Sequence, residues 1–438
     1  MDSEALARQV IAKLREVGHQ AFLVGGCVRD LLLGMKPRDF DIATDARPDR
    51  IMDLFPRSGR VGAHFGVVLV RDVFDQVEVA TFRSDHDYED GRHPEYVRFE
   101  SEPREDVLRR DFTINGLMMD PDTGTVLDFV DGRGDLARGV IRAIGDPYAR
   151  FREDHLRLLR GVRFAARLGF EIEPATFDAM RRDHALILNV AMERVREELV
   201  LILTEGGARR GFELLDAGGM LADLLPEVAA MKGVAQPPEY HPEGDVWRHT
   251  LLLLEQLRQP TPTLALGALL HDVGKPPTFR LADRIRFDGH VEAGVRLASI
   301  ILTRLRFSRE EIEQVEALID NHMRFKDVKR MKESTLKRFL RLPEFQEHLE
   351  LHRLDAMSSN HRLDNYALAK AKFEEYTAEH LQPVPLLTGA DLIGMGYQPG
   401  PQFSRILRAL EDAQLEGRVR THEEAMDLCR DLFPLPTT

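Results

Sequence analysis

The chain has 438 residues, of which 43% are hydrophobic and 30% charged, and its formal net charge is −13 at pH 7. This composition indicates a soluble globular protein, and the length predicts two to four domains. The negative charge excludes indiscriminate binding of nucleic acid, although a local basic surface would still bind RNA phosphates. No apolar run approaches the roughly 20 residues that span a bilayer, and the amphipathic N-terminus lacks the apolar core of a signal peptide. We therefore predict a cytoplasmic protein without a membrane partner.

Residues 1–140 predict a mixed α/β domain. Four strands are expected, over 21–24, 39–43, 66–70 and 76–82. The first is a short buried run that ends at Gly25 and Gly26, and the last two are rich in β-branched residues. The two glycines would let backbone amides approach a triphosphate. Arg29, which follows them, would hold a phosphate oxygen by paired hydrogen bonds.

Two carboxylates mark the strand expected over 39–43. Asp39 and Asp41 are separated by one residue, so their side chains would point to the same face of a strand. Neighbouring carboxylates repel each other unless a cation lies between them, and Mg²⁺ takes oxygen ligands while leaving places for substrate phosphates. Glu78 on the last strand would complete a catalytic trio, or would instead be a salt-bridge partner on the strand face.

After Pro147 the pattern becomes helical, with no convincing strand to the C-terminus. Four arginines recur at spacings of three and four and would share one helix face. They are Arg157, Arg160, Arg163 and Arg167. This row is one candidate surface for RNA phosphates, and the basic run RFKDVKRMKESTLKRFLR over 324–341 is another. Each run has an alternative interpretation as a solvated helix face.

Histidines and aspartates recur between residues 240 and 360, around the sequence LLHDVGK. Imidazoles and carboxylates at such positions would hold one or two transition metals, which activate water for phosphoester cleavage. The pattern resembles the HD superfamily of metal phosphohydrolases. The candidate ligands are His249, His271, Asp272, His290 and Asp355, with His322 as a further histidine of the pattern. The alternative is that this region serves only as a scaffold.

Residues 22–44, FLVGGCVRDLLLG followed by RDFDIAT, resemble the signature of the nucleotidyltransferase superfamily to which DNA polymerase β belongs. Three further segments resemble, in the family order, motifs of the class II tRNA nucleotidyltransferases (CCA-adding enzymes) and of bacterial poly(A) polymerases. They are RRDFTIN over 109–115, DFVDGRGDL over 128–136 and EDHLR over 153–157. Four motifs in this order are specific, so the chain is identified as a member of this family.

The resemblance implies roles for individual residues. Asp39 and Asp41 would bind the catalytic metals, while Asp154 and Arg157, three apart on a predicted helix, would select the base. Cytosine and adenine both carry an amine beside an acceptor nitrogen, which suits a carboxylate and a guanidinium, whereas uracil and guanine do not. An ordinary intrahelical ion pair is the alternative for Asp154 and Arg157. The other nucleotide-binding positions are Gly25, Gly26, Arg29, Arg109, Arg110, Asp111, Asn115, Arg160 and Arg163.

Within the family, we expect an enzyme that adds C, C and A to the 3′ end of tRNA from CTP and ATP. The stretch VGAHFGVVLV over 61–70 lacks the arginine pair that poly(A) polymerases of this type carry there, and the chain is acidic. The segment over 84–99 has the length expected for full CCA addition rather than CC addition, and its composition predicts a mobile surface loop. Addition of A alone and poly(A) synthesis remain alternatives. An HD-domain phosphohydrolase is the alternative of another class, and Asp39 and Asp41 disfavour a non-enzymatic RNA-binding protein.

The fold expected is α+β, with a polymerase β-like nucleotidyltransferase head followed by an all-helical neck, an HD-like body and a tail. The predicted boundaries are 1–140 for the head, 141–205 for the neck, 206–380 for the body and 381–438 for the tail. Loops are expected over 232–244 and 382–401. The expected partners are tRNA, CTP and ATP, with Mg²⁺ at the head, a transition metal in the HD-like region and no protein partner.

Overall fold

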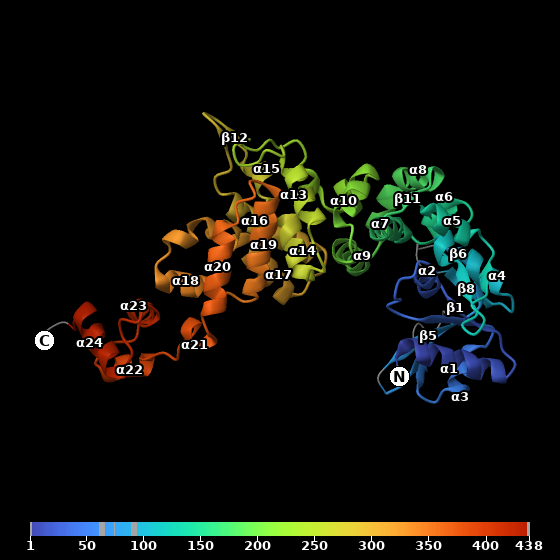
Figure 1. Ribbon diagram of the computed structural model, residues 1–438, viewed down its shortest axis with the longest axis horizontal. Coiled ribbons are helices and arrows are strands. Elements are labelled where there is room, and N and C mark those ends of the chain that lie inside the picture. The colour runs from blue at the N-terminus through green and yellow to red at the C-terminus, as the bar shows by residue number, and fades with distance from the viewer. Residues whose placement is uncertain (1, 61–65, 74, 89–93, 436–438) are drawn as a thin grey trace. The chain divides into compact units, whose positions relative to one another are not determined.

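The computed structural model describes residues 2–60, 66–73, 75–88 and 94–435. The chain divides into two compact units, which Figure 1 shows from blue to red along the sequence. The first comprises residues 1–229 with 304–306, and the second comprises residues 230–303 with 307–438. The four-part division expected from the sequence is finer and stays a prediction. None of the described helices is both long and apolar enough to cross a bilayer.

A mixed seven-stranded sheet forms the centre of the head within the described residues. Its spatial order is β3 (Ser58–Arg60), β4 (Val67–Arg71), β5 (Gln76–Thr81), β2 (Asp41–Thr44), β1 (Ala21–Val24), β8 (Leu117–Met119) and β9 (Val126–Asp128). Strands β2 and β5 run parallel, and the other neighbours are antiparallel. The strands expected over 21–24, 66–70 and 76–82 are confirmed as β1, β4 and β5. The strand expected over 39–43 begins only at Asp41, so Asp39 lies on the segment that leads into it.

Helices cover both faces of this sheet (Figure 1). Helices α1 (Ser3–Glu16) and α3 (Pro48–Leu54) pack together on one face, and α2 (Gly26–Leu32) lies on the other. The apolar residues of α1 fall at helical spacing and are buried. They are Leu6, Ala7, Val10, Ile11 and Leu14. The remaining helical elements of the head are α4 (Pro103–Leu108), η1 (Thr113–Asn115) and α5 (Gly132–Arg138).

A β-hairpin of β6 (Arg83–Tyr88) and β7 (Pro94–Phe99) occupies most of the segment that was expected to be a mobile surface loop. That expectation is wrong for these two strands, because antiparallel backbone pairing does not depend on the polar side chains that suggested a loop. Residues 89–93 lie outside the described residues. Residues 61–65, which belong to the 61–70 stretch that lacks the arginine pair of poly(A) polymerases, also lie outside them.

The rest of the first unit is almost entirely helical. Its helices are α6 (Pro147–Glu153), α7 (Arg157–Leu168), α8 (Pro174–Arg182), η2 (His184–Asn189), α9 (Met192–Thr204), α10 (Ala208–Ala217), α11 (Met220–Leu224) and α12 (Pro226–Ala229). Helix α7 packs against both α9 and α10. A Cβ on Gly161 of α7 would lie only 3.0 Å from the ring of Phe112. This close approach places the 109–115 segment directly against α7.

Short strands contradict the expectation of no strand after Pro147. β10 (Val140–Ile141) pairs in parallel with β11 (Glu171–Ile172), and β12 (Arg280–Leu281) forms a hairpin with β13 (Ile285–Arg286). Strands of two residues are too short to produce an alternating pattern in the sequence.

The second unit is helical apart from β12 and β13. Its helices are α13 (Val246–Glu255), α14 (Pro262–Leu270), α15 (Lys275–Thr278), α16 (His290–Arg304), α17 (Arg309–Asn321), η3 (His322–Arg330), α18 (Glu333–Leu340), α19 (Phe345–Ser358), α20 (Asp364–Glu375), α21 (Ala378–Leu381), α22 (Gly389–Gly394), α23 (Pro401–Leu415) and α24 (His422–Leu432). An apolar cluster between Leu387 and Cys429 joins the last three of these helices. The α+β class, with a mixed-sheet head and a helical remainder, is therefore confirmed.

Candidate nucleotide and metal sites

Three carboxylates meet where β2 and β5 run side by side. The parallel register places Asp41 opposite Glu78, and Asp39 lies two residues before Asp41 on the segment that enters β2. Burial, the charge of Glu78 and that of Asp39 raise the pKa of Asp41 to about 6, although Arg110 opposes them. This mutual repulsion is the electrostatic condition that a bound cation would relieve.

A cavity of about 440 Å³ adjoins these carboxylates. All eleven predicted nucleotide-binding residues line it. They are Gly25, Gly26, Arg29, Arg109, Arg110, Asp111, Asn115, Asp154, Arg157, Arg160 and Arg163. Asp39 and Asp41 line the same cavity, while Glu78 lies beside it on β5. The volume is in the range of small-molecule sites, which is roughly 300–1,000 Å³.

The glycine pair forms the turn between β1 and α2. Gly25 has a φ of 76°, in the left-handed region that glycine adopts without strain, and its amide donates to the carbonyl of Leu117 on β8. A Cβ at Gly25 would lie 3.2 Å from Nη1 of Arg110. Arg29, one turn into α2, is buried and donates to Asp30 and, over 2.8 Å, to the side-chain carbonyl of Asn115.

Asp106 holds the two arginines of the 109–115 segment. It is completely buried on α4 and accepts from Arg109 over 2.5 Å and from Arg110 over 2.8 Å. Burial would raise the pKa of Asp106, but the two adjacent guanidinium charges outweigh it and lower this pKa to about 2. The sequence analysis did not identify Asp106, although its position three and four residues before two arginines is the spacing of helical ion pairs.

Asp111 and Asn115 continue this network across the cavity. The carboxylate of Asp111 binds Arg160 of α7 over 2.7 Å and accepts from the amide of Asn115 over 3.0 Å. Burial opposes ionisation of Asp111, but the charge of Arg160 and these hydrogen bonds keep its pKa below the usual value. The 109–115 segment is thereby joined both to α2, through Asn115, and to α7, through Asp111.

The prediction that Asp154 and Arg157 lie on one helix is wrong. Helix α6 ends at Glu153, Asp154 adopts an extended backbone with φ −138° and ψ 104°, and α7 begins at Arg157. The Asp154 side chain accepts from the amide of Leu156 over 3.2 Å, which favours a helix start over continuation. Both side chains still line the cavity.

Different partners hold the two side chains. Arg157 binds Glu153 over 2.9 Å and donates to the carbonyl of Arg109 over 2.8 Å, so it is fixed to the 109–115 segment. The carboxylate of Asp154 lies 3.5 Å from the guanidinium of Arg194 on α9. The alternative interpretation as an ion pair within one helix therefore does not describe these residues.

The arginine row of α7 is confirmed as one helix face, but it is not an exposed surface for RNA. Arg157 and Arg163 are only 8% exposed, and the row lines the nucleotide cavity. Arg167 and Phe164 also line this cavity, although the sequence analysis did not assign them there. The guanidinium of Arg163 lies 4.4 Å from the centre of the Phe164 ring, within the range of cation–π attraction.

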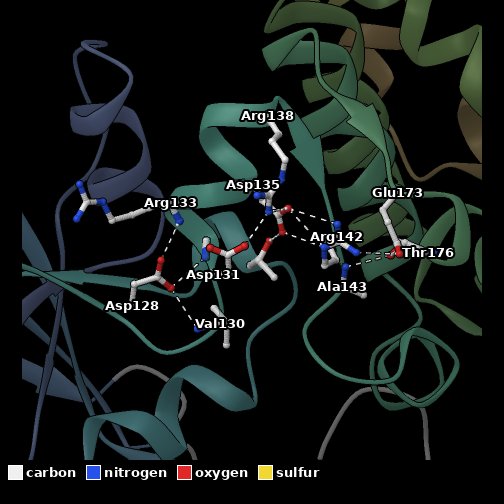
Figure 2. Close-up of polar contacts among 12 residues, drawn as sticks. Asp128, Val130, Asp131, Arg133, Asp135, Arg138, Arg142, Ala143, Glu173 and Thr176 are labelled. Atoms are coloured by element: carbon white, nitrogen blue, oxygen red, sulfur yellow. Dashed lines mark hydrogen bonds and ion pairs between the residues drawn. The ribbon is translucent and has the colours of Figure 1, made fainter.

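The 128–136 segment supports the site from outside the cavity. Figure 2 shows Asp128 accepting from the backbone amides of Val130 and Arg133. It also shows the buried Asp135 beside Arg138 and Arg142. The second carboxylate oxygen of Asp135 accepts from the hydroxyl of Thr113 over 2.7 Å. Asp135 therefore fixes the start of η1 within the 109–115 segment, whereas Asp128 fixes the turn before α5.

The HD-like region contains a separate cluster in the second unit, beside a cavity of about 540 Å³. Three groups of side chains have ligand atoms within 4.8 Å of one another. The first is His249, His271 and Asp355, the second is Asp272, His290 and His322, and the third is His241, Glu243 and His249. The structure therefore brings the five predicted HD ligands together and adds His322, which was part of the sequence pattern but not among the predicted ligands.

Three of these histidines have the same tautomer imposed by the backbone. Nδ1 of His271, His290 and His322 lies 3.0, 2.9 and 2.6 Å from the carbonyl oxygen three residues earlier. Because a carbonyl only accepts, Nδ1 carries a proton, and Nε2 presents a lone pair whenever the ring is neutral. Nε2 of His290 is buried without a hydrogen-bond partner among the described residues. Metal-binding histidines in proteins have this arrangement, so the donor set fits a transition metal.

His249 is held from the 232–244 loop, which the sequence analysis treated only as a linker. Its Nδ1 lies 2.7 Å from Glu243, and its Nε2 lies 3.1 Å from Asp355. Burial would lower the pKa of His249, but Asp355 and Glu243 outweigh it and raise this pKa to about 9. His241 binds the same oxygen of Glu243. Both residues were missed because a loop brings them to the cluster without any periodic signal.

The second predicted RNA surface, over 324–341, is only partly available. Arg338 and Arg341 bind Glu411 of α23, and Lys337 is buried. Four cations of the N-terminal half are exposed, whereas Arg324 is half-buried and donates to Asn321. The exposed cations are Lys326, Lys329, Arg330 and Lys332.

Comparison with known families assigns each of these regions. Residues 21–142 match the "Poly A polymerase head domain", residues 169–232 match the "Probable RNA and SrmB- binding site of polymerase A", and residues 245–363 match the "HD domain". The first match contains the carboxylates and the glycine turn, and the third contains the histidine cluster.

Individual relatives differ in how much of the chain they match. A CCA-adding enzyme of Limosilactobacillus fermentum is 44% identical over 205 residues, which are 47% of this chain and 51% of the relative. The chain thus spans about half the length of this relative. A CC-adding tRNA nucleotidyltransferase of Thermus thermophilus is 34% identical over 430 residues, or 92% of both chains. A solved structure, the CCA-adding enzyme of Bacillus stearothermophilus in complex with CTP, superposes with a TM-score of 0.76 and 26% identity over 99% of both chains.

The contribution of Asp106 yields a pH-dependent prediction. Because its pKa is about 2 in the folded chain against an ordinary value of 3.8, its stabilisation is fully present above about pH 4 and is lost as the pH falls toward 2. We expect Asp106→Asn to lower the free energy of unfolding at pH 7 by on the order of 2 kcal/mol. Urea titrations followed by circular dichroism between pH 2 and 7 would measure the difference. Asp178→Asn, at an exposed acid of α8, is the control. A difference from wild type that stays constant down to pH 2 would contradict the assignment.

Proposed function

Because the chain belongs to the tRNA nucleotidyltransferase family built on the poly(A) polymerase head, we propose that it extends the 3′ end of tRNA with C, C and A from CTP and ATP. The observation that carries this proposal is a single cavity that combines two metal-type carboxylates with seven arginines. Such a cavity suits a triphosphate, whose negative charge needs both cations and guanidinium groups.

The carboxylate trio fits Mg²⁺. Asp39 and Asp41 offer oxygen donors of the kind that Mg²⁺ prefers. Burial and the charges of Glu78 and Asp39 raise the pKa of Asp41, and a bound cation would stabilise its ionised form. Bound there, Mg²⁺ would neutralise phosphate charge and activate the 3′ hydroxyl of the tRNA. Glu78, on the neighbouring strand, would add to the negative field that holds the cation. The protein's own contribution is to hold these donors in place before the nucleotide arrives.

The arginines would bind and orient the nucleotide. Arg29 and Arg167, next to Gly25 and Gly26, would bind the phosphate groups, since Asp30 fixes both guanidinium groups at this end of the cavity. Arg160 would contact the middle of the nucleotide, where Asp111 holds it. Paired hydrogen bonds from guanidinium groups suit phosphate oxygens in both number and geometry.

Base selection would rest on Asp154 and Arg157. The carboxylate accepts from the amine of cytosine or adenine, and the guanidinium donates to the adjacent ring nitrogen. Uracil or guanine would place a carbonyl oxygen against Asp154, an unpaired and repulsive contact. Glu153 holds Arg157, and Asp154 lies near Arg194, so both side chains have defined positions in the cavity. Asp154 and Arg157 would therefore select the base by themselves, without a nucleic-acid template.

The number of nucleotides added distinguishes the remaining alternatives. The Thermus thermophilus relative, which matches over 92% of both chains, is a CC-adding enzyme, so CC addition is a specific alternative that the segment over 84–99 had argued against. Addition of A alone and poly(A) synthesis are the other two.

We propose that the tRNA contacts the exposed cations of the 324–341 run through its phosphates. The four-part domain division and a cytoplasmic location remain predictions.

A metal phosphohydrolase activity is a second candidate function, and the histidine cluster favours it. His249, His271 and Asp355 would hold one transition metal, and Asp272, His290 and His322 a second, since the ligand atoms of each group lie within 4.8 Å. A metal bound there would activate water for attack on a phosphoester. Glu243 would fix the ring of His249, and the backbone carbonyls would fix the other three imidazoles.

For the principal function, we expect the wild-type protein to extend tRNA transcripts that end in the discriminator base, in C or in CC, with labelled CTP and ATP. Asp41→Asn should lower each rate roughly 10²- to 10³-fold, because it removes a charged metal ligand while keeping its shape. Asp49→Asn, at an exposed acid of α3, is the matched control. Extension that stops after CC would identify a CC-adding enzyme, and extension only of transcripts that already end in CC would identify an A-adding enzyme. Continued addition of A would identify a poly(A) polymerase. Near-normal rates for Asp41→Asn at saturating Mg²⁺ would contradict the site.

For base selection, Asp154→Ala should relax discrimination against UTP and GTP by roughly 10- to 100-fold while slowing CTP less. Single-nucleotide incorporation with each of the four nucleoside triphosphates on one tRNA would measure it. Asp178→Ala provides an exposed aspartate control. An equal loss with all four nucleotides, or unchanged discrimination, would show that another group selects the base.

For the second function, we expect His290→Ala and Glu243→Gln to weaken Ni²⁺ binding by the full chain roughly 10- to 100-fold, measured by calorimetry. Ni²⁺ is the probe because it favours imidazole ligands over the carboxylates of the head. His422→Ala, at an exposed histidine of α24, is the control. Nucleotide addition should survive both variants. Unchanged Ni²⁺ affinity, with no metal-stimulated phosphatase or cyclic phosphodiesterase activity, would leave the region as a scaffold.

A further inference from the structure

Glu205 joins three arginines from two parts of the first unit. It ends α9, and its side chain is only 8% exposed. Its carboxylate lies 3.2 Å from Nη1 of Arg163, 4.0 Å from Nη1 of Arg167 and 3.0 Å from Nη1 of Arg38. The first two arginines belong to α7, whereas Arg38 immediately precedes Asp39 on the segment that enters β2.

The turn that follows Glu205 is fixed against α7. Gly206 and Gly207 have φ values of 101° and 75°, in the left-handed region that side chains rarely adopt. A Cβ on Gly207 would overlap the carbonyl oxygen of Ala166, so only glycine allows the chain to lie this close to α7. The backbone of the Gly206–Gly207 turn therefore helps to fix the position of Glu205, in addition to its ion pairs.

Two of the arginines that Glu205 contacts, Arg163 and Arg167, line the same cavity as Gly25 and Gly26. Arg167 lies 3.0 Å from Asp30, and Asp30 in turn binds Arg29 over 2.7 Å. Arg163 uses Nε for Glu198 and Nη1 for Glu205, and within the described part of the chain Nη2 makes no hydrogen bond, so it is available to a ligand. When carboxylates bind two nitrogens of a guanidinium, the remaining N–H groups point in one direction. This lowers the entropy cost of binding a phosphate.

We propose that Glu205 is a positioning residue that directs Arg163 and Arg167 toward the triphosphate of the incoming nucleotide and connects them to the segment carrying Asp39. The inference rests on the proposed nucleotide-binding function of this cavity. Its contact with Arg38 is mostly exposed and contributes little by itself, so the buried pairs with α7 carry the larger share. Glu205 acts on the phosphate end, whereas Asp154 and Arg157 act on the base.

Binding measurements with Glu205→Gln test this division. We expect the dissociation constants of CTP and of inorganic triphosphate, measured by calorimetry with Mg²⁺ and without tRNA, to rise by the same factor, roughly 5- to 30-fold. The ratio of CTP to UTP affinity should stay within twofold of wild type. Glu205→Asp, which keeps the charge but shortens the side chain, should recover part of the loss. Glu213→Gln, at an exposed ion pair of α10, is the matched control and should bind like wild type.

The outcomes separate this inference from the proposed function. A wild-type protein that binds CTP and triphosphate but adds no nucleotide to tRNA would contradict the proposed function and leave the role of Glu205 standing. Folded Glu205→Gln with unchanged triphosphate affinity would overturn the inference, as would a selective loss of CTP binding with triphosphate unaffected. If circular dichroism shows that Glu205→Gln does not fold, Glu205→Asp serves as the test variant. Triphosphate affinity equal to that of wild type in Glu205→Asp would overturn the inference about Glu205.

Discussion

Ion pairing between guanidinium and carboxylate groups is the interaction on which the nucleotide cavity depends. Seven arginines line about 440 Å³, and without counter-charges they would repel one another strongly in a partly buried space. The buried or half-buried partners come from five different elements or element ends. They are Asp30, Asp106, Asp111, Glu153, Glu198 and Glu205. Folding therefore fixes the direction of each arginine before any ligand binds, which is the condition for preorganised stabilisation of a charged substrate.

The histidine cluster obtains the same rigidity from the backbone. His271 follows the last turn of α14, and His322 follows that of α17, where helix carbonyls have no intrahelical partner. Each imidazole satisfies one of these carbonyls through Nδ1 and so presents Nε2 to the cluster. One hydrogen bond thus completes a helix end and selects a tautomer. In both sites, one end of the side chain is held so that the other end faces the cavity. Carboxylates hold the arginines of the first site, and backbone carbonyls hold the imidazoles of the second.

The sequence was sufficient to predict the residues that line the cavity and insufficient to predict the residues that hold them in place. Asp39, Asp41 and the nucleotide-binding residues lie in short motifs whose spacing is local, and the cavity contains all of them. Glu205 contacts Arg163 through tertiary packing across 42 residues, and Glu243 lies in an irregular loop, so no periodicity marks either position. The break at Asp154 was missed for a different reason. Its flanking arginines continue a helical spacing, while one side chain-to-backbone hydrogen bond ends the helix.

The way the holding residues overlap explains how base selection would be coupled to catalysis. Arg157 donates to the carbonyl of Arg109, and Asp106 binds both Arg109 and Arg110. Arg110 in turn lies close enough to Asp41 for its charge to oppose the rise that burial and Glu78 cause in the pKa of Asp41. The residues proposed to bind the base and those proposed to bind the metal are thus connected through the 109–115 segment, so a base that fits Asp154 and Arg157 would place its triphosphate at a set distance from the carboxylates. A base that does not fit would lose binding energy and would also misplace the reacting phosphate, and a displacement of this kind costs rate in addition to affinity.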